Sequence, residues 1–289
     1  MTGEAQVRLL GDGRRLHFNH GPIDIVALAE GDEAEVQAAY VQGDARFSSI
    51  LEELVAELPR LRAPVEEVRP VLNGAVAQRM ASAVWPHRGS FVTPMAAVAG
   101  AVADEVLAAL VEGRDLKRVY VNNGGDIAFY LAPGQSFDAG IVDDADAPAL
   151  DARVGLMYDM PVRGLATSGW RGRSHSLGIA DAVTVLAECT AVADVAATLI
   201  ANEVNVDQAL IERAPASALS DDSDLGDLLV TVAVGELPAE AVEQALAAGL
   251  ACANAMLDAG LLFSAYLSLQ GRVKMAGADA RLSAVGGAK

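Results

Sequence analysis

The stretch GLATSGWRGRSHSLGIADAVTVLAECTAVADVAATLIANEV, residues 164–204, sets hydroxyl, imidazole and carboxylate side chains between apolar runs. Residues 181–187 place β-branched side chains at short spacing, which predicts a strand buried on at least one face. Residues 191–202 repeat apolar side chains at helical spacing, which predicts a helix directly after that strand. We expect the chemistry of the chain to lie in this stretch, with the remainder acting as scaffold.

Asp194 and Thr198 lie four residues apart and therefore point from the same face of the predicted helix. Carboxylate and hydroxyl oxygens are suitable ligands for Mg²⁺, which takes one or two carboxylates and completes its shell with substrate phosphates. The same pair also fits a solvated patch or a simple side-chain hydrogen bond. Spacing alone therefore leaves the metal site as one of three alternatives.

The start of the stretch predicts a tight turn built from small and hydroxyl residues. Thr167, Ser168 and Gly169 would leave backbone N–H groups free to meet an anion, although an ordinary turn has the same composition. Asp181 would lie at the mouth of the predicted strand. His175, in the intervening loop, and Asp181 are the candidate bases.

Four motifs follow one another in a fixed order along the chain. They are Asn123-Gly124-Gly125-Asp126, Ala166-Thr167-Ser168-Gly169, Ser174-His175, and Ala193-Asp194 with Thr198. This order resembles the ApbE superfamily, whose best-known members are flavin transferases that bind FAD and Mg²⁺ and move FMN onto a protein threonine or serine.

The resemblance implies a set of site residues, together with FAD and Mg²⁺ as cofactors. It also implies a flavin dinucleotide as ligand and a possible acceptor protein as partner. The implied cofactor-binding residues are Gly124, Gly125, Asp126, Thr167, Ser168 and Gly169. The implied metal ligands are Asp194, Thr198 and the backbone carbonyl of Val98.

Two departures separate this chain from the flavin transferases. Their first helix carries Ala-Lys-Gly-Tyr, whereas the matching residues 98–101 here are Val-Ala-Gly-Ala, so the lysine is missing. The loop after Ser174-His175 is also shorter than in the transferases. With both departures, the chain resembles a shorter, functionally uncharacterised ApbE-like subfamily. We therefore expect the fold and the ligand class of the flavin transferases to apply to this chain better than their reaction does.

Three classes of function remain open. The first is a Mg²⁺-dependent enzyme that cleaves the FAD pyrophosphate or transfers FMN to a hydroxyl acceptor. The second is a flavin- or nucleotide-binding module without catalysis, which the missing lysine favours. The third is an auxiliary protein of sulfur or cofactor metabolism that uses Cys189 or Cys252, and it requires a reactive thiol.

Composition limits the partners of the chain. The 21 basic and 39 acidic side chains give a net charge of −18, which opposes binding to nucleic acid or to an anionic membrane. Residues 1–10 contain no apolar run like the core of a signal peptide, so we expect a cytoplasmic protein. A homo-oligomer remains possible. With 289 residues, the chain is long enough for one domain or two closely packed subdomains.

Hairpin-like turns at residues 11–13 and 124–125 predict an α+β fold with mainly antiparallel sheets and a possible internal duplication. We expect Asn73 to cap a helix over residues 75–84, and His17 and His20 to be exposed on a strand. Residues 205–227 are expected to end a helix and continue as a surface loop. The expected helices span residues 33–58, 75–84, 95–111, 191–202 and 238–257.

The helix predicted over residues 95–111 is almost wholly Ala, Val and Leu in its first part, which indicates a central position in the core. Gly100 lies within it and would let another backbone or a ligand come close.

Overall fold

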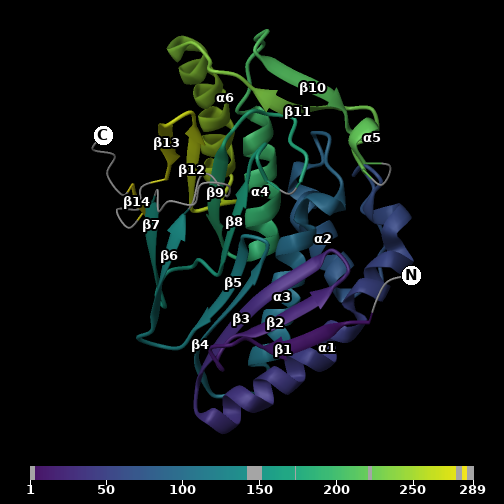
Figure 1. The fold of residues 1–289 in the computed structure, drawn as a ribbon, viewed down its shortest axis with the longest axis vertical. Helices are drawn as coiled ribbons and strands as arrows, with labels where there is room; N and C mark the ends of the chain where they lie inside the picture. The colour runs from purple at the N-terminus through teal and green to yellow at the C-terminus, as the bar shows by residue number, and fades with distance from the viewer. Residues whose placement is uncertain (1–3, 142–151, 173, 221–222, 278–281, 285–289) are drawn as a thin grey trace. The chain divides into compact units, whose positions relative to one another are not determined.

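The computed structural model describes residues 4–141, 152–172, 174–220, 223–277 and 282–284 (Figure 1). The described residues divide into two compact units. The first unit contains the residues up to 136, together with 157–165 and 188–195. The second contains the described residues of 137–156, 166–187 and the chain from 196 onward.

The sheet of the first unit begins with five strands that neighbour one another in chain order. Each strand pairs antiparallel with the next, and the beginning of β8 (Gly164–Ser168) pairs antiparallel with β5. The predicted turns at residues 11–13 and 124–125 lie between β1 and β2 and between β4 and β5. The five strands are β1 (Gln6–Leu9), β2 (Leu16–His20), β3 (Ile23–Gly31), β4 (Leu116–Asn123) and β5 (Asp126–Leu131).

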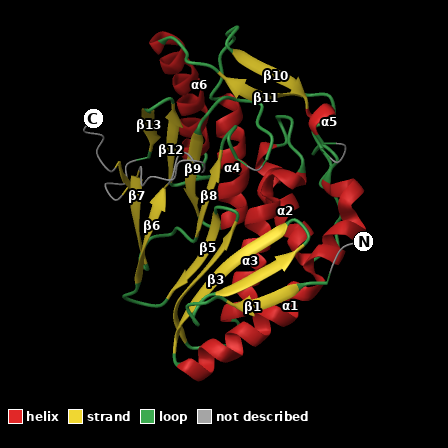
Figure 2. Ribbon diagram, in the orientation of Figure 1, coloured by secondary structure: helices red, strands yellow, loops and turns green. Residues whose placement is uncertain are grey.

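Three α-helices complete the first unit and lie behind its strands in Figure 2. Helix α1 (Glu33–Leu61) packs on β2 and β3, and helix α3 (Val98–Val111) packs on β4 and β5. Helix α2 (Ala75–Val84) packs against both. Two short 3₁₀ helices follow α2, η1 (Trp85–His87) and η2 (Pro94–Ala97). The central position predicted for residues 95–111 is confirmed, because seven residues of α3 are buried.

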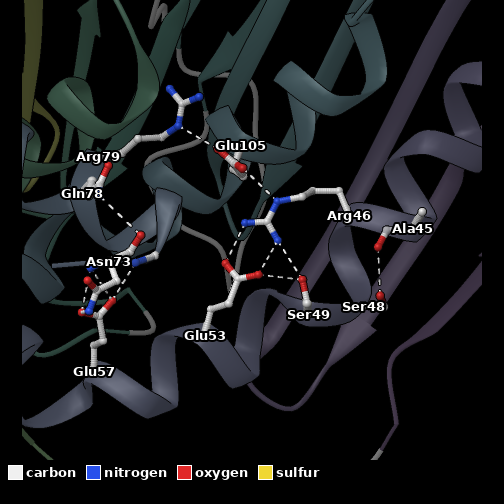
Figure 3. Close-up of polar contacts among 11 residues, drawn as sticks. Ala45, Arg46, Ser48, Ser49, Glu53, Glu57, Asn73, Gln78, Arg79 and Glu105 are labelled. Atoms are coloured by element: carbon white, nitrogen blue, oxygen red, sulfur yellow. Dashed lines mark hydrogen bonds and ion pairs between the residues drawn. The ribbon is translucent and has the colours of Figure 1, made fainter.

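An ionic network joins the three helices of the first unit (Figure 3). The guanidinium of Arg46 on α1 donates to Glu53 on the same helix and to Glu105 on α3, both at 2.8 Å. Arg79 on α2 donates to the other oxygen of Glu105 at 2.9 Å. Because Glu105 is shared by two guanidinium groups, one carboxylate links α3 to both of its neighbours.

Helix α2 receives its N-terminal cap from a distant side chain. Its N-cap residue, Gly74, has no side chain to offer, and Glu57 of α1 accepts the backbone N–H groups of Gly74 at 2.8 Å and Asn73 at 2.9 Å (Figure 3). The predicted cap by Asn73 is wrong, since the Asn73 side-chain amide is itself a donor to Glu57. The carboxylate of Glu57 thus accepts the N–H of the N-cap residue and that of the residue before it.

The prediction that His17 and His20 are exposed is also wrong. His17 is partly buried and lies 3.2 Å from the Asp24 carboxylate. His20 is 2% exposed, because it continues the inward-facing positions of β2 that begin with Leu16 and Phe18. In the described part of the chain neither ring nitrogen of His20 has a hydrogen-bond partner, although Glu52 Oε1 lies 3.4 Å from Nε2.

The second unit contains the end of β8, followed in its sheet by β9 (Ala182–Ala187), β12 (Ser264–Leu269) and β13 (Arg272–Ala276). Strand β12 pairs antiparallel with both β9 and β13, and α6 (Ala239–Asp258) packs on β12 and β13. A second sheet has the order β14-β7-β6. Its strands are β14 (Leu282–Ala284), β7 (Ala152–Met157) and β6 (Ser136–Ile141).

The first strand of a separate antiparallel ribbon lies within residues 205–227, where the sequence predicted a helix end and a surface loop. Strand β10 (Ile211–Pro215) pairs with β11 (Leu229–Val234), and the short helix α5 (Ala216–Leu219) follows β10. Residues 211–215 form a strand because β11 pairs with them. Their own sequence is too polar to predict a strand. Helix α4 (Thr190–Glu203) begins in the first unit and ends in the second.

The α+β fold with mainly antiparallel sheets is confirmed by the strand pairings. The internal duplication and the number of domains stay predictions. Among the described residues, one helical span, Pro94–Val111, is long and apolar enough to cross a membrane by length and composition. Half of this span is buried within the protein, as expected for the core helix that it contains.

We predict that Glu57→Gln lowers the free energy of unfolding at pH 7 and that this loss shrinks as the pH falls towards 3. The N–H groups of Gly74 and Asn73 hold the pKa of Glu57 below its ordinary value. A carboxylate with a lowered pKa in the folded state stabilises the fold above its unfolded pKa, about 4.3, and that contribution disappears as the pH falls through the folded value. Denaturant unfolding at both pH values measures the difference.

The exposed Glu66 provides the control, and Glu66→Gln should have little effect at either pH. An equal loss for Glu57→Gln at pH 7 and pH 3 would contradict an ionised cap.

Candidate functional site

Asp194 lies on α4 and faces the N-terminus of α3. Its Oδ2 atom accepts the backbone N–H of Gly100, the third residue of α3, at 3.0 Å. The N-cap residue of α3, Ala97, has no side-chain oxygen to offer, so Asp194 supplies the missing acceptor. A carboxylate at this position is also stabilised by the positive end of the helix dipole.

Asp104 makes the converse contact. This side chain, on α3, is 9% exposed, and its two oxygens accept the backbone N–H groups of Thr190 at 3.0 Å and Ala191 at 2.9 Å. These are the first two residues of α4. Each helix therefore provides one aspartate to the first turn of the other, and we call Gly100, Asp104, Thr190, Ala191 and Asp194 the reciprocal cap.

Two glycines bring backbones into direct contact at the reciprocal cap. A Cβ atom on Gly100 would lie 2.4 Å from the carbonyl oxygen of Thr190. A Cβ atom on Gly164, at the start of β8, would lie 2.2 Å from the backbone nitrogen of Thr190. No side chain fits at such distances, so the close approach predicted at Gly100 is confirmed and a second one, at Gly164, is added.

The turn between β4 and β5 also reaches the N-terminus of α3. The side-chain amide of Asn123, 7% exposed, donates to the carbonyl oxygen of Ala99 at 3.0 Å. Gly124 and Gly125 adopt positive φ angles of 67° and 115°, and Gly125 donates its N–H to Asn122 Oδ1. The first residue after this turn is Asp126, whose side chain hydrogen-bonds to Asp194.

Asp126 and Asp194 thus form a pair of carboxyl groups that the sequence had assigned to separate roles. Removal from water raises the pKa of Asp194, while the Gly100 N–H and the Asp126 side chain act in the opposite direction. A hydrogen bond between two carboxyl groups requires a proton on one of them, because two carboxylates at contact distance repel. Burial likewise raises the pKa of Asp104, against the bonds from Ala191 and Thr190.

The donor set around Asp194 fits a hard cation. The carboxyl groups of Asp126 and Asp194 lie together at a place where a divalent cation could neutralise both, and Mg²⁺ takes oxygen ligands of this kind. The other predicted ligands are partly buried: Val98 is the first residue of α3, and Thr198 lies one turn beyond Asp194 on α4. Within the described ranges no three His, Cys, Asp or Glu side chains are grouped to hold a metal ion.

The turn predicted at residues 167–169 is partly wrong. Thr167 and Ser168 belong to strand β8, because Thr167 joins the interior of the second unit through a 2.8 Å bond between its hydroxyl and that of Thr184. Gly169 follows the strand, and a Cβ atom there would lie 2.3 Å from the carbonyl oxygen of Asp181. Residues 124–126 and 167–169 belong to different units, so the cofactor site that the resemblance implies for both stays a prediction.

Asp181 holds two turns of the second unit together. Its Oδ1 atom accepts from Trp170 Nε1 and Arg171 Nε, both at 3.2 Å, and Oδ2 accepts the backbone N–H of Gln270 at 2.5 Å. The Arg171 guanidinium also stacks on the Trp170 ring at 4.9 Å from its centre. These contacts give Asp181 a structural role, and its role as a base stays a prediction.

His175 is exposed on a segment that is otherwise well anchored. Its neighbour Ser176 is buried, bonded through its hydroxyl to Asn202 Oδ1 at 3.3 Å and through its carbonyl oxygen to the Thr231 N–H at 2.9 Å. The exposed imidazole thus directly precedes an anchored residue. Its role as a base stays a prediction as well.

The cysteines are poor candidates for nucleophiles. Burial raises the pKa of Cys189 and of Cys252 to about 11. At neutral pH a thiol with such a pKa is almost entirely protonated, and the thiolate is the reactive form. The third class of function, which requires a reactive thiol, is therefore disfavoured.

The fold and the site together define an α+β protein built around two helix N-termini that face each other. A family model described as AbpE bacteria matches residues 7–275. The chain belongs to this family, within the ApbE-like superfamily, which confirms the resemblance seen in its motifs.

Several relatives are UPF0280 proteins of methanogenic archaea. The chain is 36% identical over 215 residues to one from Methanopyrus kandleri, covering 73% of this chain and 82% of that protein. It is 36% identical over 193 residues to one from Methanosphaerula palustris, covering 66% and 77%. Among solved structures, it is similar to the apo form of Pseudomonas stutzeri flavinyl transferase ApbE, with 12% identity, a TM-score of 0.46 and 95% of both chains covered.

We predict that Gly100→Ala destabilises the protein, although alanine is the better helix former by roughly 1 kcal/mol. The added methyl group would overlap the Thr190 carbonyl, and overpacking of this kind costs about 1–3 kcal/mol or more. Thermal unfolding measures the change. Gly89→Ala is the control, because a Cβ atom there meets nothing within 4 Å. A stabilised Gly100→Ala would contradict the backbone contact.

We also predict that the native protein reacts slowly with iodoacetamide at pH 7 and rapidly once it is unfolded. The raised pKa values of Cys189 and Cys252 keep both thiols protonated in the folded state. Mass analysis of alkylated peptides follows each cysteine separately. Rapid modification of either cysteine in the native protein would reopen the thiol-based function.

Proposed function

We propose that the protein binds FAD together with Mg²⁺ and that the cation depends on Asp194. Membership of an ApbE-like family supports the ligand class. The observation that carries the proposal is the position of Asp194, a partly buried carboxylate between the N-terminus of α3 and the carboxyl group of Asp126. Polar groups concentrated in this way at a helix N-terminus favour a ligand with phosphate groups and a cation.

The proposed metal ligands are Asp194, Thr198 and the carbonyl oxygen of Val98. When bound, Mg²⁺ would neutralise charge on the pyrophosphate and on the reacting phosphorus. The backbone of the glycine turn would contact the dinucleotide, as would the end of β8. These proposed cofactor contacts are Gly124, Gly125, Asp126, Thr167, Ser168 and Gly169.

The proposed reaction is cleavage of the FAD pyrophosphate by a hydroxyl acceptor, either a side chain of another protein or water. The acceptor oxygen bonds to phosphorus as the bond between phosphorus and the bridging oxygen breaks, releasing AMP. His175 or Asp181 would take the proton of the acceptor. FMN is thereby transferred to the acceptor, or released when the acceptor is water.

A second candidate is a flavin-binding module that retains the ligand and lacks the reaction. The observation that favours it is the sequence Val98-Ala99-Gly100-Ala101, which has no lysine at the start of α3. Incubation with FAD and Mg²⁺ followed by mass analysis separates the two candidates. FMN, AMP or an FMN-labelled protein indicates the enzyme, and intact bound FAD indicates the module.

We predict that Asp194→Ala abolishes the Mg²⁺-dependent part of FAD affinity and leaves the fold intact. The substitution removes the carboxylate on which the cation depends and leaves the N–H of Gly100 without its acceptor, at a cost of about 1 kcal/mol in stability. Calorimetric titration with FAD, in Mg²⁺ and in chelator, measures the affinity. Circular dichroism reports the fold.

Asp44→Ala, which removes an exposed aspartate from α1, is the control and should bind as the wild type does. Equal FAD affinity of the wild type in Mg²⁺ and in chelator would overturn the metal-dependent proposal. So would a full Mg²⁺ effect in Asp194→Ala.

A further inference from the structure

We propose that Asp104 is a positioning residue for Asp194, acting through the first turn of α4. The geometry behind this inference is that of the reciprocal cap. Its consequence for ligand binding rests on the proposed function. The two oxygens of Asp104 accept backbone N–H groups of α4. Asp104 determines where α4 begins, and the start of α4 determines where the Asp194 carboxylate lies.

The two hydrogen bonds of Asp104 fix the start of α4 in both position and direction. One oxygen accepts from Thr190 and the other from Ala191, at 3.0 Å and 2.9 Å. A carboxylate that accepts two successive N–H groups fixes the orientation of the peptide as well as its distance. Asp194 follows Thr190 by four residues, about one helical turn, so a displaced first turn would carry Asp194 with it.

The glycine contacts leave little freedom for the first turn of α4. Backbone atoms at Gly100 and at Gly164 approach Thr190 so closely that neither position could carry a Cβ atom. These contacts limit how closely α4 can approach α3 and β8, and the bonds to Asp104 keep α4 from moving away from α3. The N–H of Gly100 then meets Asp194 at 3.0 Å, which completes the arrangement.

A purely structural cap is the competing explanation, and the chain contains a matched example of one. Glu57 on α1 accepts the N–H groups of Asn73 and Gly74 at the start of α2, just as Asp104 accepts those of Thr190 and Ala191 at the start of α4. Both caps use one carboxylate from a neighbouring helix and two successive backbone donors. Only Asp104 caps the helix that bears Asp194.

The experiment compares Asp104→Asn with Glu57→Gln in the full-length protein. Each variant replaces one carboxylate oxygen of a cap with an amide nitrogen, which donates and cannot accept a backbone N–H. We expect both variants to lose stability, and only Asp104→Asn to weaken Mg²⁺-dependent FAD binding, by about ten- to a hundred-fold, as for outer-sphere partners of metal ligands. In an Asp194→Ala background, Asp104→Asn should have no further effect on the Mg²⁺ dependence.

A second readout requires neither FAD nor Mg²⁺. Amide hydrogen exchange of Gly100, measured by NMR, reports the bond from this N–H to Asp194. We expect Asp104→Asn to accelerate exchange at Gly100, and Glu57→Gln to leave it as in the wild type. Unchanged exchange at Gly100 in folded Asp104→Asn would overturn the positioning role, as would an equal loss of Mg²⁺-dependent binding in Glu57→Gln.

The two proposals fail in different ways. If the wild type shows no Mg²⁺-dependent FAD binding, the proposed function is wrong, and exchange at Gly100 still decides whether Asp104 positions Asp194. If the wild type binds and Asp104→Asn binds equally well with an altered Gly100 exchange, Asp104 positions Asp194 without consequence for the ligand, and the inference is overturned in its functional part.

Discussion

The first unit depends on satisfying two helix N-termini that meet. Helices α3 and α4 begin in backbone contact at Gly100 and Thr190, and both beginnings carry the positive end of a helix dipole together with N–H groups that lack internal partners. A buried donor without a partner costs about 1–3 kcal/mol. Asp104 and Asp194 bring negative charge and acceptor oxygens to this junction, and each is held by the helix opposite the one that it caps. The candidate site is therefore inseparable from the packing of the two helices.

Several acidic side chains of the chain stabilise the fold through hydrogen bonds. Glu57 caps α2, Glu105 joins two arginines from different helices, and Asp181 holds two turns of the second unit. Each of these carboxylates accepts several hydrogen bonds from groups that are far away in the chain. A net charge of −18 still governs the surface, but part of the acidic content acts inside the fold as acceptors for backbone and guanidinium donors.

Sequence reasoning was most successful where local pattern and packing agree. The hairpin of Asn123 and Asp126, the apolar run of α3 and the small residue Gly100 all follow from composition and spacing, and the structure has them where expected. The predictions from sequence were wrong where a residue far away in the chain determines the local structure. Glu57, and not Asn73, caps α2. Thr167 lies in a strand, where its hydroxyl bonds to that of Thr184, and not in a turn. No sequence pattern near Asp104 indicates that it caps a helix 86 residues further along the chain, because that bond forms only in the folded protein.

The chain has two tryptophans, and each lies against an arginine within its own unit. The Arg88 guanidinium lies 4.7 Å from the centre of the Trp85 ring in the first unit, and Arg171 lies 4.9 Å from that of Trp170 in the second. Each indole therefore gives one unit its own fluorescence signal, set by a stacked cation that departs when the unit unfolds. Replacing one tryptophan at a time would assign the fluorescence change on unfolding to one unit, without a label attached to either.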